Sequence, residues 1–172
     1  MRGRRARKPS SPDEISMSVP ASFEERPSLI IPMTDLRSLR AVVVAARPPH
    51  PRAEVAAWLA EELDRATVVP PEAVPAKVVT MHARVAYRDD VTDHVGCVTL
   101  VYPGEEDAEV PAVSVLSPVG AALLGLSEGQ SIRWRTASGG LRGLTAVRVL
   151  FQPYEVAVTG DRFHEAVRFR SP

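Results

Sequence analysis

The sequence has little of several residue types that would point to particular classes of protein. It has a single cysteine, Cys97, which excludes an intramolecular disulfide and an all-cysteine metal site. No segment approaches the ~20 apolar residues that a membrane-spanning helix needs. The basic N-terminus lacks an apolar segment behind it, so we expect no secretory signal. We therefore expect a cytoplasmic protein without membrane contact, and we interpret Cys97 as a buried thiol.

The net charge of zero conceals an asymmetry along the chain. Residues 1–8, MRGRRARK, hold five of the 21 Lys and Arg residues and no acid, which leaves 16 basic residues against 21 acidic ones. Residues 1–27 also mix Arg, Ser, Pro and Glu with almost no apolar periodicity. This composition predicts a disordered basic arm at residues 1–27, followed by a slightly acidic folded body.

Two segments after this arm have helical patterns. In TDLRSLRAVVVAA, Thr34 is a candidate N-cap and Asp35 lies in the first turn, with apolar residues spaced for one helix face. RAEVAAWLAEELDRAT has a clearer apolar stripe, and its Glu61 and Arg65 have the spacing of an i, i+4 ion pair. The residues of that stripe are Val55, Trp58, Leu59, Leu63 and Ala66. Together the two segments predict a short antiparallel helical hairpin over residues 28–70.

The stretch ARPPHPR, residues 46–52, separates the two helices and forms the predicted hairpin tip. Pro48 and Pro49 end the first helix because proline lacks an N–H and clashes with the preceding turn. The side chains that this tip presents are Arg47, His50 and Arg52. The tip is therefore basic and has no carboxylate.

From Lys77 onward the apolar period changes from 3.6 to 2, which is typical of half-buried strands. We predict strands at residues 77–89, 96–103, 112–116, 131–136 and 145–153. The last strand is expected to bury Val147, Val149 and Phe151. Residues 154–172 show no clear pattern, and we interpret them as a tail.

A short apolar helix is expected between the third and fourth of these strands. Ser117 is a plausible N-cap, Pro118 takes the first helical position, and Gly125 can adopt the left-handed conformation that ends a helix. Leu123, Leu124 and Leu126 should fill the core beneath the sheet.

These motifs resemble a known family. VSVLSPVGAALLGLSEGQSIRW and VRVLFQP are similar to the C-terminal domain of the GreA/GreB transcript-cleavage factors. With LIIPMTDLRSLR, VVTMHARV and TLVYPGEE, the chain resembles the regulator of nucleoside diphosphate kinase branch (Rnk) of the Gre superfamily, over roughly residues 27–153. The resemblance implies an α+β fold in which the helical hairpin precedes an FKBP-like domain, an antiparallel β-sheet wrapped on a short helix, at residues 71–153.

The resemblance also implies that the domain docks on RNA polymerase at the rim of its secondary channel. In Gre factors an Asp-Ser-Pro segment contributes to that contact. Here Ser117 and Pro118 match it, whereas Leu116 stands in the place of the aspartate and Ala121 in the place of a basic residue. Leu116, Ser117 and Pro118 are therefore the residues that we expect to bind RNA polymerase.

Gre factors carry two carboxylates at the hairpin tip to hold magnesium, and the tip of this chain has none. Glu54 is the nearest acid and lies alone in the second helix. The four histidines have no metal-ligand spacing among them. We therefore expect no catalytic residue, metal or cofactor. The expected protein is a monomeric, non-enzymatic regulator that competes with Gre factors at the secondary channel without stimulating transcript cleavage.

Two alternative functions remain open. An FKBP-like fold would suit a peptidyl-prolyl isomerase or chaperone-like domain, although fold alone does not determine function and the few aromatic residues read as core. The second alternative is a basic nucleic-acid-binding protein, because several arginines fall on outward or edge positions of the predicted sheet. They are Arg84, Arg88, Arg133, Arg135, Arg142 and Arg148.

Overall fold

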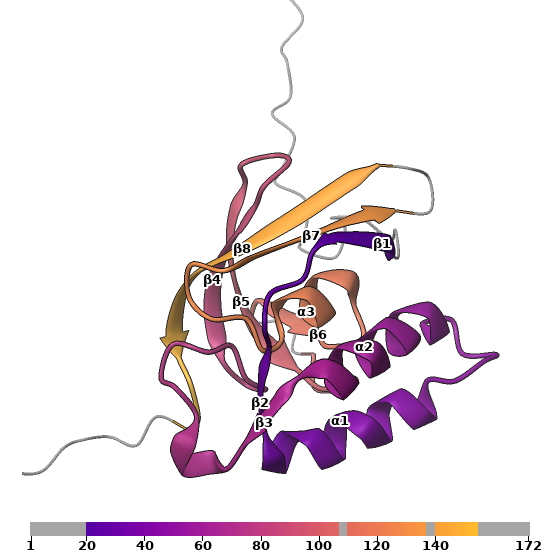
Figure 1. The fold of residues 1–172 in the computed structure, drawn as a ribbon, viewed down its shortest axis with the longest axis horizontal. Coiled ribbons are helices and arrows are strands. Elements are labelled where there is room, and N and C mark those ends of the chain that lie inside the picture. The colour runs from indigo at the N-terminus through magenta and orange to yellow at the C-terminus, as the bar shows by residue number, and fades with distance from the viewer. Residues whose placement is uncertain (1–19, 107–109, 137–139, 155–172) are drawn as a thin grey trace, which may run out of the picture.

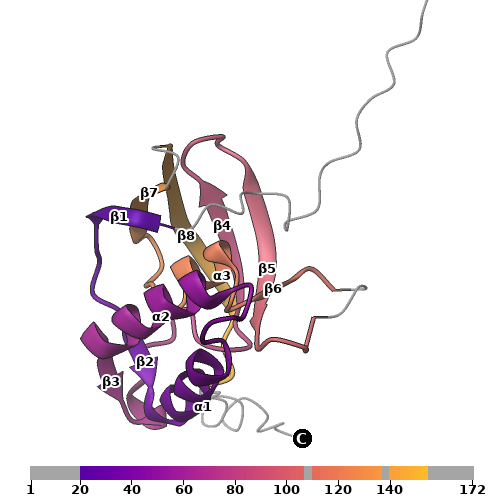
Figure 2. The ribbon, with the colours of Figure 1, turned by 90° about the vertical axis from the view of Figure 1, so that its right-hand side faces the viewer.

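The computed structural model describes residues 20–106, 110–136 and 140–154. The helices are α1 (Met33–Ala45), α2 (Ala53–Arg65) and α3 (Pro118–Leu123), with a 3-10 turn, η2 (Pro71–Ala73). Helices α1 and α2 are joined by residues 46–52 and pack together, and α3 lies between α2 and the sheet (Figures 1 and 2). None of the helices in these ranges is long and apolar enough to cross a membrane.

Two sheets complete the fold. The larger sheet has the strand order β1-β7-β8-β4-β5-β6, and β2 pairs with β3 in a separate sheet. The strands are β1 (Pro20–Glu25), β2 (Ile30–Pro32), β3 (Thr67–Val69), β4 (Arg84–Asp89), β5 (Val95–Val101), β6 (Ala112–Ser114), β7 (Ser131–Thr136) and β8 (Leu141–Phe151). The fold is a mixed α+β arrangement with a curled sheet and few helices (Figure 1). The prediction of a wholly antiparallel sheet is wrong in one place, because β6 runs parallel to β5.

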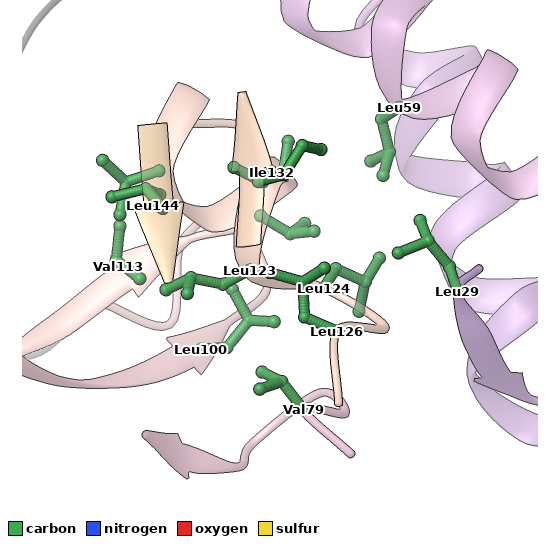
Figure 3. Packing of buried hydrophobic residues seen from close by; sticks show 14 of the residues in the cluster. Leu29, Leu59, Val79, Leu100, Val113, Leu123, Leu124, Leu126, Ile132 and Leu144 are labelled. Carbon is green, nitrogen blue, oxygen red and sulfur yellow. The ribbon is translucent and has the colours of Figure 1, made fainter. Parts of the chain in front are cut away.

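The leucines of the α3 segment fill the core, as the sequence predicted. Leu123, Leu124 and Leu126 are fully buried, and Figure 3 shows them between the strands and the long helices. Gly125 adopts φ 76°, the left-handed conformation expected after the helix. The α2 stripe is also buried, except for the half-buried Ala66 at its end.

Part of the predicted basic arm belongs to the sheet. Residues 20–25 form β1, which pairs antiparallel with β7. The prediction of disorder is therefore wrong for this segment, since composition does not show that an edge strand of the sheet is available for pairing. The remainder of the arm, residues 1–19, and most of the predicted tail lie outside the described residues.

The first predicted strand begins later than its alternating pattern suggested. β4 starts at Arg84, and the residues before it, Val78 to Met81, are all buried. Thr80, a polar residue that alternates with the apolar Val79 and Met81, has no exposed surface. The segment is bonded on both sides, since Val79 N–H donates to the Leu126 carbonyl and Met81 N–H to Asp35 Oδ2. Because residues 78–81 are buried on both sides, they lack the solvent-exposed face that the alternating pattern predicted.

The predicted inner face of the last strand is also wrong. Val147 and Phe151 are exposed, Val149 is only half-buried, and Leu144 and Ala146 are buried instead. The register of β8 against β4 shifts twice, once on each side of the Arg148–Ala86 pair. Each shift is a β-bulge that inserts one extra residue and reverses the side on which the following residues lie.

Several smaller predictions are corrected by side-chain contacts. Thr34 is not the cap of α1, which begins one residue earlier, and its hydroxyl is hydrogen-bonded to Tyr154. Arg65 pairs with Glu62 at i, i+3 rather than with Glu61. Cys97 is only half-buried because it lies on the outward side of β5.

Candidate functional site

The segment Leu116–Pro118, which we call the LSP turn, leads from β6 into α3. Ser117 Oγ accepts a hydrogen bond from the Gly120 N–H at 3.0 Å and donates one to the Ser114 carbonyl at 2.8 Å. It is therefore the N-cap of α3, as predicted. Leu116 and Ser117 are buried, and Pro118 is half-buried.

The backbone packs tightly beneath this turn. A Cβ atom placed on Gly120 would lie 2.0 Å from the Ser114 carbonyl oxygen, so only glycine fits at this position. The cap and the close contact together fix the LSP turn against β6 and make it a rigid feature of the domain.

Residues 46–52, which we call the proline loop, connect α1 to α2. The loop is closed by its own hydrogen bonds, from the His50 N–H to the Arg47 carbonyl and from the Arg52 N–H to His50 Nδ1. The Pro48–Pro49 peptide bond is cis. Ala46 is buried where α1 ends, whereas the side chains of Arg47, His50 and Arg52 are exposed.

One contact joins the proline loop to the LSP turn. The Arg52 guanidinium donates from Nη1 to the Leu116 carbonyl oxygen at 3.3 Å, across 64 positions of sequence. The two segments that the sequence singled out separately therefore lie side by side. Among the described residues, Arg47 has no such contact with the LSP turn.

A groove of about 620 Å³ opens where these segments meet. One wall is α1, another is the 102–105 loop, and His50 and Leu116 complete it. Most of the α1 wall is apolar and consists of Ala41, Val42 and Ala45, and Ala46 of the proline loop continues it. Polar groups gather at the opposite wall, so the groove is apolar on one side and polar on the other.

Tyr102 and Glu105 supply the polar wall of the groove. Glu105 Oε2 lies 2.8 Å from His82 Nε2 and accepts the Tyr102 N–H at 3.0 Å. Burial alone would raise the pKa of the Glu105 carboxyl, but these hydrogen bonds and the charge of His82 outweigh it and lower that pKa. Burial, with the charge of Asp35, raises the pKa of Tyr102 to about 12. At neutral pH the wall carries a carboxylate and a neutral phenol.

A buried carboxylate lies behind this wall. Asp35 Oδ1 accepts a hydrogen bond from the Tyr154 hydroxyl at 2.6 Å, and its Oδ2 accepts the Met81 N–H at 3.4 Å. Burial raises the pKa of Asp35 more than the hydrogen bonds from Tyr154 and Met81 lower it. The contact ties residue 154 to the start of α1, at the beginning of the segment that the sequence left as a tail.

Sequence reasoning missed the groove because nothing in the pattern gave its polar residues a role in a site. Glu105 and Tyr102 both fall in TLVYPGEE, which contributed to the family resemblance, and Tyr102 also falls in a predicted strand, but neither pattern indicated a site. The acid in the first turn of α1 was recognised, but nothing in the pattern showed that Tyr154 would reach it.

Two further observations concern metal binding and enclosed space. Across residues 20–106, 110–136 and 140–154, no group of three or more His, Cys, Asp or Glu side chains could hold a metal ion. The space beside the buried Trp134 has a volume of only about 10 Å³. A space of that volume is barely large enough for one water molecule.

This chain is similar in sequence to known proteins. The family described as "Transcription elongation factor, GreA/GreB, C-term" matches residues 74–149. The regulator of nucleoside diphosphate kinase from Escherichia coli (strain K12) is 39% identical over 128 residues, covering 74% of this chain and 93% of that protein. A relative of the same name from Shigella flexneri has the same identity and coverage.

A solved structure is also similar to this fold. The prokaryotic transcription elongation factor GreA/GreB from Nitrosomonas europaea aligns with a TM-score of 0.57 at 36% identity, covering 73% of this chain and 100% of that chain. The LSP turn and the 102–105 loop both fall inside the segment that the family description matches. The proline loop lies before that segment.

Proposed function

Because the chain belongs to the GreA/GreB transcription factor family, with regulators of nucleoside diphosphate kinase among its relatives, we propose that it binds RNA polymerase at the secondary channel and competes there with Gre factors without stimulating transcript cleavage. The polymerase-binding residues in this proposal are Leu116, Ser117 and Pro118, with the proline loop beside them. The reading of α1 and α2 as a Gre-type hairpin, and of the sheet with α3 as an FKBP-like unit, is part of the same proposal.

The observation that carries the proposal is the hydrogen bond from Arg52 to the Leu116 carbonyl. It joins the loop that would point toward the channel to the turn that would dock at its rim. A partner that contacts the LSP turn would also meet the groove, since Leu116 lines it. Because Leu116 and Ser117 are buried, Pro118 and the groove walls would supply most of the contact surface.

The mechanism in this proposal is occupancy. Transcript cleavage by a bound factor requires carboxylates that hold magnesium and its water. The proline loop offers Arg47, His50 and Arg52, and the nearest acid, Glu54, lies exposed in the first turn of α2. The loop would therefore occupy space at the channel without supplying a metal ligand. Any influence on nucleoside diphosphate kinase, as the names of the relatives suggest, would be indirect.

A groove-filling substitution tests the docking surface. Ala45→Trp places an indole in the groove, whereas Ala57→Trp makes the same change at an exposed position of α2 that does not line it. In a binding titration with core RNA polymerase we expect Ala45→Trp to weaken binding at least tenfold and Ala57→Trp to leave it within twofold. The unfolding midpoint of each variant shows whether it folds normally. If the unaltered chain does not associate with polymerase, the proposal is wrong.

A cleavage assay tests occupancy separately. With stalled elongation complexes and a Gre factor, adding this chain should slow transcript cleavage in proportion to its concentration, and the chain alone should cause none. Cleavage stimulated by the chain alone would contradict the assignment. Polymerase binding without any slowing of the Gre factor would contradict competition while leaving docking intact.

A further inference from the structure

The large sheet has an outer face, on the side away from α3. The residues of this outer face have no role in the proposed function. Along β4, Val85 and Tyr87 are buried, so Arg84, Ala86 and Arg88 point outward. The pairing register extends this outer face to neighbouring strands. The residues opposite these three are Thr99, Cys97 and Val95 on β5 and Phe151, Arg148 and Thr145 on β8.

The two bulges of β8 create the middle of this face. They leave Val149 opposite the buried Val85 while turning both Arg148 and Phe151 outward. Phe151 lies directly opposite Arg84, and its side chain is 55% exposed. Residues directly opposite in an antiparallel pair have Cβ atoms about 5 Å apart, and diagonal neighbours about 7 Å. The exposed Phe151 ring therefore lies beside Arg84, and Arg148 is the next outward residue along the same strand.

The outer face carries more arginines than acids. Arg88 is paired with Asp90 at 3.0 Å, and Arg133 lies close to the same acid across Gly143. Within the part of the chain that the structure describes, Arg84, Arg133 and Arg148 form no ion pair. The face thus carries four exposed arginines, with Asp90 beside Arg88 and Glu25 of β1 in register with Arg133, on a body whose overall charge is slightly negative.

We propose that this outer face binds single-stranded RNA, with Arg84 and Arg148 on phosphates and a base stacked on Phe151. Arginines on adjacent strands give sequence-independent attraction for a phosphate backbone, and an exposed aromatic ring accepts the face of any unpaired base. Outward side chains on neighbouring strands of a sheet suit unpaired, splayed bases, as in other sheet-based RNA-binding domains. A duplex has no base face free to stack on Phe151.

The choice of RNA follows from the family description, because a transcription elongation factor works beside a newly made single strand of RNA. An acidic protein surface would also meet the arginines and the exposed Val95 opposite Arg88, but an unpaired base with its phosphate matches an aromatic ring beside an arginine more directly. The outer face and the groove lie on different parts of the domain. RNA binding does not depend on docking to polymerase, so either proposal can fail without the other.

The test is a fluorescence-anisotropy titration of the full chain with a labelled single-stranded RNA of mixed sequence, repeated at several salt concentrations. The double variant Arg84→Ala/Arg148→Ala should bind ~10-fold more weakly at about 0.1 M salt, and the slope of log K against log salt should become shallower by about 1.4. Phe151→Leu should weaken binding by ~5-fold or more with an unchanged slope, because stacking releases no counterion.

Controls separate this face from the other basic parts of the chain. Arg37→Ala/Arg40→Ala removes two exposed arginines of α1 and should change the affinity less than twofold. Arg4→Ala/Arg5→Ala measures the contribution of the N-terminal arm. The proposal is overturned if the arm variant abolishes binding while the sheet variants bind normally. An effect of the arginines without any effect of Phe151→Leu also overturns it, as does tighter binding to duplex DNA or single-stranded DNA of the same sequence.

Discussion

The LSP turn and the proline loop touch each other but are built in different ways. The LSP turn is fixed from within, by the Ser117 cap and by the close approach of Gly120 to Ser114. The proline loop is fixed by its own backbone and keeps its charged side chains in solvent. Substitutions in the turn will therefore change folding before they change binding, whereas substitutions in the loop can change binding alone.

This difference affects how a polymerase-binding experiment should be read. Loss of binding after replacement of Ser117 would not show a direct contact, because the side chain is buried and already bonded on both sides. Loss of binding after a change in the exposed loop or the groove wall would show one. We therefore expect substitutions in the LSP turn to have large effects on stability and substitutions in the proline loop to have small ones.

Gly120→Ala should have the largest effect. The added methyl group would overlap the Ser114 carbonyl oxygen at 2.0 Å, and neither backbone segment can move without disturbing the core. We expect a loss of about 3 kcal/mol in the free energy of unfolding, measured by urea denaturation. Gly104→Ala is the matched control. It has φ 90° but open space around it, so backbone strain alone should cost about 1 kcal/mol. Equal losses would show that the turn is not tightly packed.

Ser117→Ala should have the next largest effect on the turn. It removes the cap of α3 and the donor to the Ser114 carbonyl, for an expected cost of about 1–2 kcal/mol. Urea denaturation measures this cost, with Ser28→Ala at an exposed position as the control. A variant as stable as the parent chain would mean that the LSP turn does not depend on its cap.

The carboxylate behind the groove adds a pH-dependent prediction. Burial raises the pKa of Asp35 above its ordinary value of 3.8, so the folded state favours the protonated form. That contribution is fully present below pH 3.8 and is lost as the pH rises through the raised value. The unfolding free energy of Asp35→Asn should therefore improve relative to the parent chain between pH 3.5 and 7.

Tyr154→Phe sharpens this prediction. It removes a hydrogen bond that lowers the pKa of Asp35, so it should strengthen the dependence on pH. Urea denaturation at three pH values measures both variants. Parallel pH profiles for the parent chain and Asp35→Asn would contradict the assignment.

Local signals made the turn and its helix predictable. A serine cap, a proline at the first helical position and a glycine after the last turn each act within a few residues, and all three hold in the structure. The similarity to the GreA/GreB family, stated from these motifs, is confirmed by the comparisons. The core leucines of this segment followed from the same local pattern.

Features that depend on distant partners could not be predicted in this way. The bulges of β8 depend on how it pairs with β4, and one of them turned Phe151 from an expected core residue into an exposed one. The groove depends on α1 meeting the 102–105 loop, and no pattern within either segment records that contact. The polymerase contacts of Leu116, Ser117 and Pro118 stay a prediction.

Arg52→Ala should have the smallest effect on stability and is the most specific test of the comparison, because it removes the hydrogen bond from the loop to the turn. The hydrogen bond is 3.3 Å long and its donor side chain is exposed, so its loss should cost only about 0.5 kcal/mol. Arg47→Ala removes the same charge from the same loop without removing that bond, and its effect should be smaller still. If the loop and the turn act as one surface, Arg52→Ala should weaken polymerase binding several-fold more than Arg47→Ala does. Equal losses would show that only the charge of the loop matters and that the contact with Leu116 does not position it.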